Sequence, residues 1–180
     1  SVIVGGDSNK VYAPYSIIGG GQQNCICNTS QQSTIGGGTY NRILQTNRNA
    51  TIGGGESNLI SGSCGYGNTI SGGTGNRICG NTSECTQRNT IGGGSLNYII
   101  GPRCATISGG SNNRISGSGA CHSFIGGGRD NGICTTTGLS GYAASIVGGW
   151  QNKAGGFMSS IIGGCNNFSN NNYTVVAGGF

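Results

Sequence analysis

Charged residues, proline and histidine are scarce in this chain of 180 residues. Only 7% of the residues are charged, two are proline and one is histidine. Although 40 residues are glycine, the lack of proline and of a strict three-residue period excludes collagen. No apolar run reaches the ~18 residues of a transmembrane helix, so we expect no membrane span. The nine Lys and Arg residues are scattered, so the net charge of +5 does not indicate nucleic-acid binding.

Groups suited to catalysis or metal binding are equally few. The four acidic residues lie far apart in the sequence, and no cysteine pair has the CxxC spacing. Sugar hydrolysis needs two carboxylates within ~5–10 Å, and a structural zinc site usually needs closely spaced ligands. The glycine pairs lack the following Lys-Ser/Thr of a phosphate-binding loop. The sequence therefore predicts a protein that is not an enzyme and that needs no cofactor or metal.

What the sequence does contain is a short repeat. An apolar residue followed two and three positions later by glycine occurs eleven times between Ile3 and Val176, a mean period of about 17 residues. A second apolar residue stands eight positions after the first in most copies, from Val11 to Ile133. Asparagine stands six positions after the first apolar residue in ten copies: Asn9, Asn24, Asn41, Asn58, Asn76, Asn97, Asn113, Asn131, Asn152 and Asn167.

The repeat predicts an all-β fold. A period near 17 is too short for two packed helices, and β-branched residues dominate the positions between the glycines. Because side chains alternate between faces along a strand, each copy gives two short strands with one inward isoleucine each. We therefore expect a parallel β-solenoid of about eleven coils, with tight corners at the glycines. The asparagines form either a hydrogen-bonded ladder between coils or simple turns.

The domain organisation follows from the same repeat. Residues 1–180 form a single domain, and we expect the longer copies near 79–90 and 134–145 to bulge as loops. The chain begins and ends within the repeat, whereas solenoids usually carry atypical caps. This favours a segment of a longer chain, or one whose ends stack on a neighbour.

Threonine precedes the first isoleucine in five consecutive copies, and glycine or serine follows it. These positions predict a flat, small and uncharged face. The face could pack against another chain, present hydroxyls to ice or a carbohydrate, or simply reflect the β-propensity of threonine. The five residues are Thr34, Thr51, Thr69, Thr90 and Thr106.

Basic residues flank the second column of isoleucines, in an order that looks irregular in the sequence. This face could attract an anionic glycan or a membrane surface, or its charges could keep an exposed edge soluble. The basic residues are Lys10, Arg42, Arg77, Arg114 and Lys153, mixed with Leu59, Tyr98 and Phe168.

The nine cysteines allow two disulfides by geometry. Cys79 and Cys85 bracket the first long copy, and Cys104 and Cys121 stand at nearly the same place in adjacent copies. Disulfides would indicate an oxidising compartment. The alternative is that most of these cysteines are small buried residues.

Residues 33–43, with the sequence STIGGGTYNRI, resemble the repeats of trimeric autotransporter adhesin heads and of viral and phage fibre shafts. That resemblance implies a left-handed β-roll, usually trimeric. Residues 68–73 (NTISGG) and 105–113 (ATISGGSNN) also resemble the grass ice-binding β-roll, whose period is shorter.

Three functions therefore stay open. The first is a fibre segment on a virion or cell surface, a homotrimeric and rigid spacer with adhesion to a receptor or glycan. The second is a secreted ice-binding solenoid that uses the threonine column. The third is a subunit that stacks end to end into filaments. Each places the protein outside the cell or on a virion surface.

Overall fold

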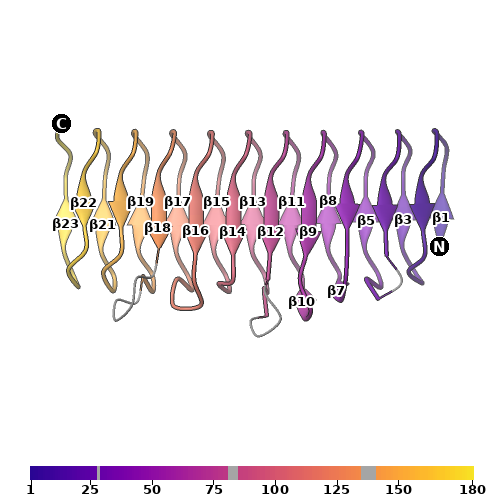
Figure 1. Cartoon of the computed structure of the whole chain (residues 1–180), viewed down its shortest axis with the longest axis horizontal. Helices are drawn as coiled ribbons and strands as arrows, with labels where there is room; N and C mark the ends of the chain where they lie inside the picture. Colours follow the sequence, from indigo (N-terminus) through magenta and orange to yellow (C-terminus); the bar gives the residue numbers. More distant parts are fainter. Residues whose placement is uncertain (28, 81–84, 135–140) are drawn as a thin grey trace.

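The described part of the chain, residues 1–27, 29–80, 85–134 and 141–180, forms a parallel β-solenoid in a computed structural model. It contains 23 short strands, and none of the described residues is helical. The turns stack into a straight rod with the two termini at opposite ends (Figure 1). The structure thus confirms the predicted all-β solenoid, with two main strands in each turn of about 17 residues.

The first sheet has eleven strands that pair in parallel in the order of the chain. They are β1 (Val2–Ile3), β3 (Ile17–Ile18), β5 (Thr34–Ile35), β8 (Thr51–Ile52), β11 (Thr69–Ile70), β13 (Thr90–Ile91), β15 (Thr106–Ile107), β17 (Phe124–Ile125), β19 (Ser145–Ile146), β21 (Ser160–Ile161) and β23 (Val175–Val176).

The second sheet has ten parallel strands and lies nearer the viewer in Figure 1. They are β2 (Lys10–Val11), β4 (Cys25–Ile26), β6 (Arg42–Ile43), β9 (Leu59–Ser61), β12 (Arg77–Cys79), β14 (Tyr98–Ile100), β16 (Arg114–Ser116), β18 (Gly132–Cys134), β20 (Lys153–Ala154) and β22 (Phe168–Ser169). A pair of strands, β7 (Asn47–Arg48) and β10 (Gly65–Tyr66), forms a small third sheet. The rod therefore has ten full turns, and β23 is the first strand of an eleventh.

The core is a double column of isoleucines, one from each main sheet. From Ile18 to Ile161 in the first sheet, and from Ile26 to Ile133 in the second, every inward isoleucine is fully buried. Burial of each such side chain contributes about 1.5–3 kcal/mol. The second column shrinks to Ala154 and Ser169 near the C-terminal end, as its sequence position indicates.

A third inward column was not predicted. Two positions before each isoleucine of the first sheet stands a small or amide side chain that is buried in every turn from the second to the tenth. Alternation along the strand turns this position inward together with the isoleucine. The column consists of Ser16, Ser33, Ala50, Asn68, Asn89, Ala105, Ser123, Ala144 and Ser159.

The asparagines form the ladder that the sequence allowed. The side-chain oxygen of Asn58 accepts a hydrogen bond of 3.0 Å from the backbone N–H of Asn76 in the next turn. The amide nitrogen of Asn58 donates to the carbonyl oxygens of Gly54 at 3.0 Å and Gly73 at 2.8 Å. The oxygen-to-backbone bond repeats at all nine steps from Asn9 to Asn167. The ladder thus runs from side chain to backbone more than from amide to amide.

The second glycine of each pair makes this corner. Its φ lies between +82° and +92° in all ten turns, from Gly6 to Gly164. A Cβ atom on Gly55 would lie 2.1 Å from the carbonyl oxygen of Gly73 in the next turn. Glycine is therefore required here both by backbone conformation and by the close approach of the turns.

The neighbouring glycines Gly54 and Gly55 give a matched test of this requirement. Gly55→Ala should lower the free energy of unfolding by at least about 2 kcal/mol, since positive φ alone costs an alanine ~1–2 kcal/mol. Gly54→Ala should be neutral or slightly stabilising, because the nearest atom to its Cβ would be 4.0 Å away. Denaturant unfolding of both variants measures the difference, and equal losses would contradict the structural account.

Removal of one rung of the ladder should also destabilise the rod. Asn58→Ala leaves the backbone N–H of Asn76 and the carbonyl oxygen of Gly54 without this partner inside the corner, while the Gly73 carbonyl keeps only its bond from the Glu56 N–H, so we expect a loss of about 2–4 kcal/mol. Asn58→Asp keeps the shape and the acceptor but replaces the donor by a carboxylate oxygen that faces two carbonyls. It should be at least as harmful at neutral pH. A wild-type unfolding midpoint for either variant would show that the ladder adds little.

Candidate functional site

The threonine face is a straight column on the outer side of the first sheet. Thr34, Thr51, Thr69, Thr90 and Thr106 are paired rung by rung in the parallel register. All five are half-buried, and the residue directly after each of these strands is glycine or serine. The structure therefore brings together all the threonines that the sequence singled out.

Exposed apolar side chains continue the same column at both ends. Ile17 precedes the threonines and is 45% exposed, while Phe124 follows them and is 38% exposed. Ser145 and Ser160 come next, and Val175 ends the column with 69% exposure. The face as a whole is flat, uncharged and apolar at its ends, which suits packing against another surface.

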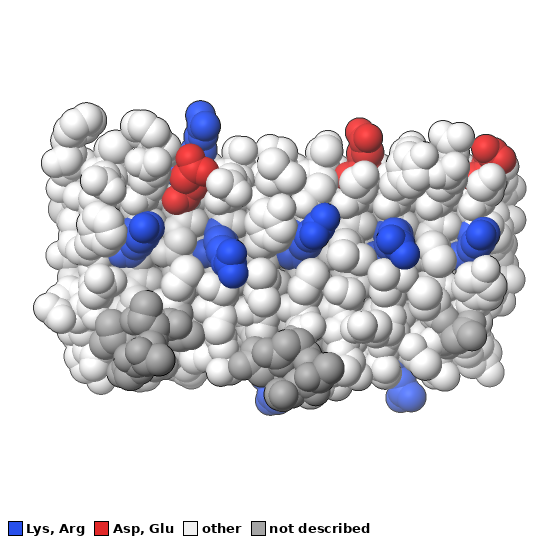
Figure 2. Space-filling view, in the orientation of Figure 1, with Lys and Arg blue, Asp and Glu red and all other residues white. Residues whose placement is uncertain are grey.

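The basic residues form a second straight line, which we call the basic row, on the outer side of the second sheet. It consists of Lys10, Arg42, Arg77, Arg114 and Lys153, all exposed and all at the first position of their strands. Basic side chains lie in line along the middle of this face in Figure 2. Five of the nine Lys and Arg residues thus occupy one position of the repeat.

The order that looked irregular in the sequence is regular in space. The register pairs Lys10 with Cys25, Cys25 with Arg42, and Arg42 with Leu59. The same alternation continues to the last strand, through Arg77, Tyr98, Arg114, Gly132, Lys153 and Phe168. A cation therefore stands on every second turn, with an uncharged residue between each two. Each of these residues stands seven positions after the first apolar residue of its copy, so the alternation was present in the sequence but was not recognised there.

None of the basic-row side chains has an acidic partner among the described residues. The single ion pair in that part of the chain joins Arg129 and Asp130 at 3.2 Å, and Asp130 borders the hollow between Arg114 and Lys153 without pairing with either. Two of the cations lie instead near aromatic rings of the next turn: Arg77 is 6.0 Å from the ring centroid of Tyr98, and Lys153 is 5.5 Å from that of Phe168. The row thus presents positive charge that the described chain does not neutralise.

Shallow hollows lie between the cations. One is bordered by Lys10, Cys25 and Arg42, and another, of about 400 Å³, lies between Arg114 and Lys153 over Gly132. Burial, and then the neighbouring Cys27, raises the pKa of the Cys25 thiol above its ordinary value. Cys25 is therefore neutral at pH 7 in spite of the cations on both sides, and the first hollow has no negative charge in its floor.

Acidic side chains lie beside the basic row, on the upper edge of Figure 2. Asp130 accepts hydrogen bonds from the Asn112 amide at 2.6 Å and the Trp150 indole at 3.3 Å. The bond from Asn112 contributes most to a pKa of Asp130 below the ordinary range. Asp130 therefore stays ionised into moderately acidic solution and marks a negative border of the row.

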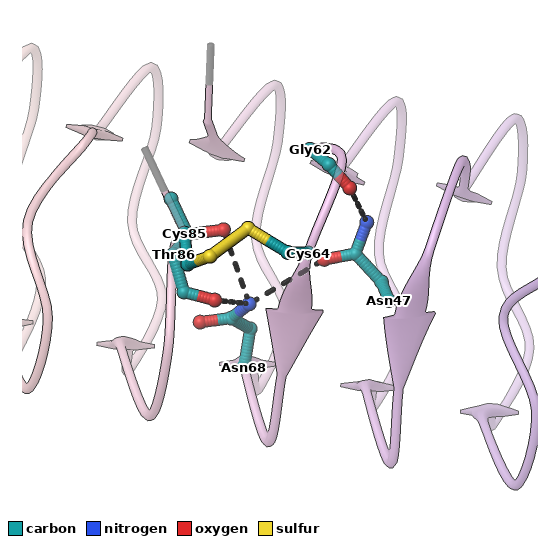
Figure 3. The surroundings of a disulfide bond; sticks show 6 residues. All are labelled: Asn47, Gly62, Cys64, Asn68, Cys85 and Thr86. Atoms are coloured by element: carbon teal, nitrogen blue, oxygen red, sulfur yellow. Dashed lines mark hydrogen bonds between the residues drawn. A yellow bond between two sulfur atoms is a disulfide. The ribbon is translucent and has the colours of Figure 1, made fainter. Parts of the chain in front are cut away.

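The structure corrects the first predicted disulfide. Cys85 is bonded to Cys64, with 4.9 Å between their Cα atoms, and not to Cys79 (Figure 3). Cys79 lies on β12, where its sulfur accepts a hydrogen bond of 3.4 Å from the Ser61 hydroxyl one turn back. The prediction was wrong because it matched cysteines across one loop instead of across two stacked turns. Residues 81–84, in the predicted bulge near 79–90, lie outside the described residues.

The second predicted disulfide is also wrong. Cys104 and Cys121 are both free thiols, because they are out of step by one residue. Cys121 stacks on Arg103, whose backbone N–H donates to its sulfur at 3.4 Å, and the position equivalent to Cys104 is taken by His122. Of the second predicted bulge, near 134–145, residues 135–140 lie outside the described residues.

A cluster of aromatic rings was missed in the sequence. His122, Tyr142, Phe157 and Tyr173 follow one another over four turns, with ring centroids 5.3–5.5 Å apart. The rings come from two neighbouring positions of the repeat, so a single column of the sequence does not show them. They stiffen the third side of the last turns, which is the segment that joins the second-sheet strand of one turn to the first-sheet strand of the next.

The described residues contain no group of three His, Cys, Asp or Glu side chains placed to hold a metal ion. They also contain no helix long and apolar enough to cross a membrane. The surfaces with a distinct chemistry are therefore the threonine face and the basic row, which lie on different sheets.

The Cys64–Cys85 disulfide leads to a prediction about the stability of the protein. It closes a loop with a sequence separation of 21 residues, so its reduction should lower the free energy of unfolding by about 3 kcal/mol. Peptide mapping of the non-reduced protein should find the peptides of Cys64 and Cys85 joined. A Cys64→Ser, Cys85→Ser double variant should unfold like the reduced wild type, and it should be insensitive to reductant. A linkage between Cys79 and Cys85 would contradict the structure.

Comparison with known proteins adds no family to this geometry. No protein-family model matches the sequence, and a search of curated proteins finds no significant match. The two surfaces and the rod that carries them are therefore the features that bear on function.

Proposed function

We propose that this protein is a rigid structural segment of a surface fibre, and that the threonine face packs against further copies of the chain in a homotrimer. The observation that carries the proposal is the threonine face itself. It is flat, uncharged, made of small residues in register over five turns, and bordered by exposed apolar side chains.

The rod is suited to a spacer. Ten turns at the strand spacing of about 4.8 Å give a length of roughly 50 Å. Each turn is tied to the next by two parallel sheets and by the asparagine ladder. Bending would stretch these bonds on one side, so the length is held stiffly.

Close packing of several rods requires a face without bulky or charged side chains. Gly36, Gly53 and Gly92 are exposed just beyond the strands, two positions after the threonines, and they carry no side chain that would hold another backbone away. Ile17, Phe124 and Val175 would gain apolar burial in the same contact. The basic row lies on the other sheet, so the cations of each chain would stay outside the assembly.

A location outside the cell or on a virion surface accords with the Cys64–Cys85 disulfide, since such bonds persist in oxidising compartments. The proposal also agrees with the resemblance of residues 33–43 to adhesin heads and fibre shafts.

A second candidate function is ice binding by a monomer. It is favoured by the regular spacing of the five threonine hydroxyls along the outer side of the first sheet. The column breaks at Phe124, Ser145 and Ser160, which leaves a short array. End-to-end stacking into filaments, the third function that the sequence left open, is tested by the same measurement of oligomeric state.

Light scattering after size exclusion, with and without reductant, separates these functions. We expect a species of three times the chain mass of 18.0 kDa. Thr69→Lys would place a charge in the middle of the threonine face. The trimer of this variant should therefore dissociate at least tenfold more readily than the wild-type trimer. Thr74→Lys, on an exposed position outside the face, is the matched control and should assemble normally.

A monomer would refute the packing role. An ice-recrystallisation assay on wild type and Thr69→Lys then tests the second candidate. Open-ended polymers that Thr69→Lys leaves unchanged would favour stacking through the ends.

A further inference from the structure

We propose that the basic row binds a linear anionic polysaccharide that lies along the rod, with one acidic group meeting a cation on every second turn. This inference rests on the proposed function, because it supplies a ligand for the outward side of a surface fibre. It does not depend on how many chains the fibre contains.

The spacing of the row is its first argument. Neighbouring rungs are about 4.8 Å apart, so neighbouring cations are roughly 9.6 Å apart, and Lys10 and Lys153 are separated by about 38 Å. A sugar chain with one acidic group in each disaccharide repeats its charge at a similar distance when it is extended. Such a chain can therefore meet cation after cation without bending or slipping out of register.

The separation also lets each cation act singly. The screening length at physiological ionic strength is ~8 Å, slightly less than the distance between neighbouring cations of the row. Two cations on adjacent turns, at half that distance, would repel each other more than twice as strongly. One anion for each cation is thus the natural stoichiometry of this surface.

The rungs between the cations suit sugar rings. Cys25 and Gly132 leave hollows between the flanking basic side chains, where the intervening sugar could sit. Tyr98 and Phe168 offer apolar ring surfaces beside Arg77 and Lys153. The exposed Asn112 lines the hollow near Arg114 and supplies a polar group for sugar hydroxyls, while Asp130 forms the acidic border of the same hollow.

The width of the row favours a single narrow chain over broader polyanions. Asp7 and Glu56 belong to one column of residues, which isolated parallel bridges link from turn to turn along the edge beside the row. Asp130 lies next to that column in the sequence. Figure 2 shows the acidic side chains above the row. A DNA duplex or an anionic membrane would cover these carboxylates as well. A duplex also carries one charge per ~1.7 Å of its axis, far denser than the cations.

Titration calorimetry with hyaluronan oligosaccharides of increasing length, which carry one carboxylate in each disaccharide, tests the inference on the whole protein. Affinity should rise with each added disaccharide until the oligosaccharide spans the row. The triple variant Arg42→Gln, Arg77→Gln, Arg114→Gln should bind about a hundredfold more weakly, at about fivefold for each cation removed. The matched control Arg48→Gln, Arg88→Gln, Arg103→Gln removes the same charge from exposed positions outside the row. It should bind nearly as well as wild type.

A second variant tests the alternation without changing composition. Leu59→Arg with Arg77→Leu keeps the net charge, but it places two cations on adjacent turns and leaves a gap behind them. We expect at least a tenfold loss of affinity. Equal binding by this variant and wild type, or equal losses in the two triple variants, would overturn the inference in favour of plain charge attraction.

Two further probes decide the ligand class. A short DNA duplex and vesicles containing phosphatidylserine should bind more weakly than the longest oligosaccharide. Tighter binding of either one through the basic row would overturn the assignment to a polysaccharide. Light scattering on the same samples keeps the proposals apart: a trimer that fails to bind refutes only the inference, and a monomer that binds refutes only the trimeric fibre.

Discussion

The hydrogen bonds between successive turns at the glycine corner are the constraint on which the rest of the structure depends. Each ladder asparagine joins two glycine carbonyls and the backbone of the next turn. The corner can form only where φ is positive and no Cβ intervenes. Once corners are stacked in this way, the strands on both sides are held in register. The isoleucines then lie on isoleucines, and the outward residues on their counterparts one turn away.

This dependence explains which features could be predicted from the sequence. The isoleucine columns, the glycine corner and the asparagine ladder are defined by fixed distances from one anchor, so counting residues finds them. Thr34, Thr51 and Thr69 lie directly before the anchor, and their column follows from the same count. Features on the third side of the turn do not follow, because the copies differ in length there. Cys64 therefore meets Cys85 instead of Cys79, and Cys104 misses Cys121 by one residue.

The basic row lies between these two cases. All of its members were recognised in the sequence, and each stands seven positions after the anchor, so their alternation was predictable by the same count but was missed until the register of the strands showed it. Spacings in the sequence are uneven because insertions occur on the third side, whereas the spacing in space is constant. A solenoid thus separates two tasks. The third side absorbs differences in length, and the two sheets keep an even pattern of surface chemistry.

The alternation of the basic row has a consequence for how such a rod can grow. The backbone repeats after one turn, but the surface charge repeats after two, so the true translational unit contains about 34 residues. Insertion or loss of a single turn would shift all later cations out of phase with those before it. Gain or loss of two turns would leave the phase intact. A lineage that lengthens this rod while it conserves the charge pattern must therefore add turns in pairs.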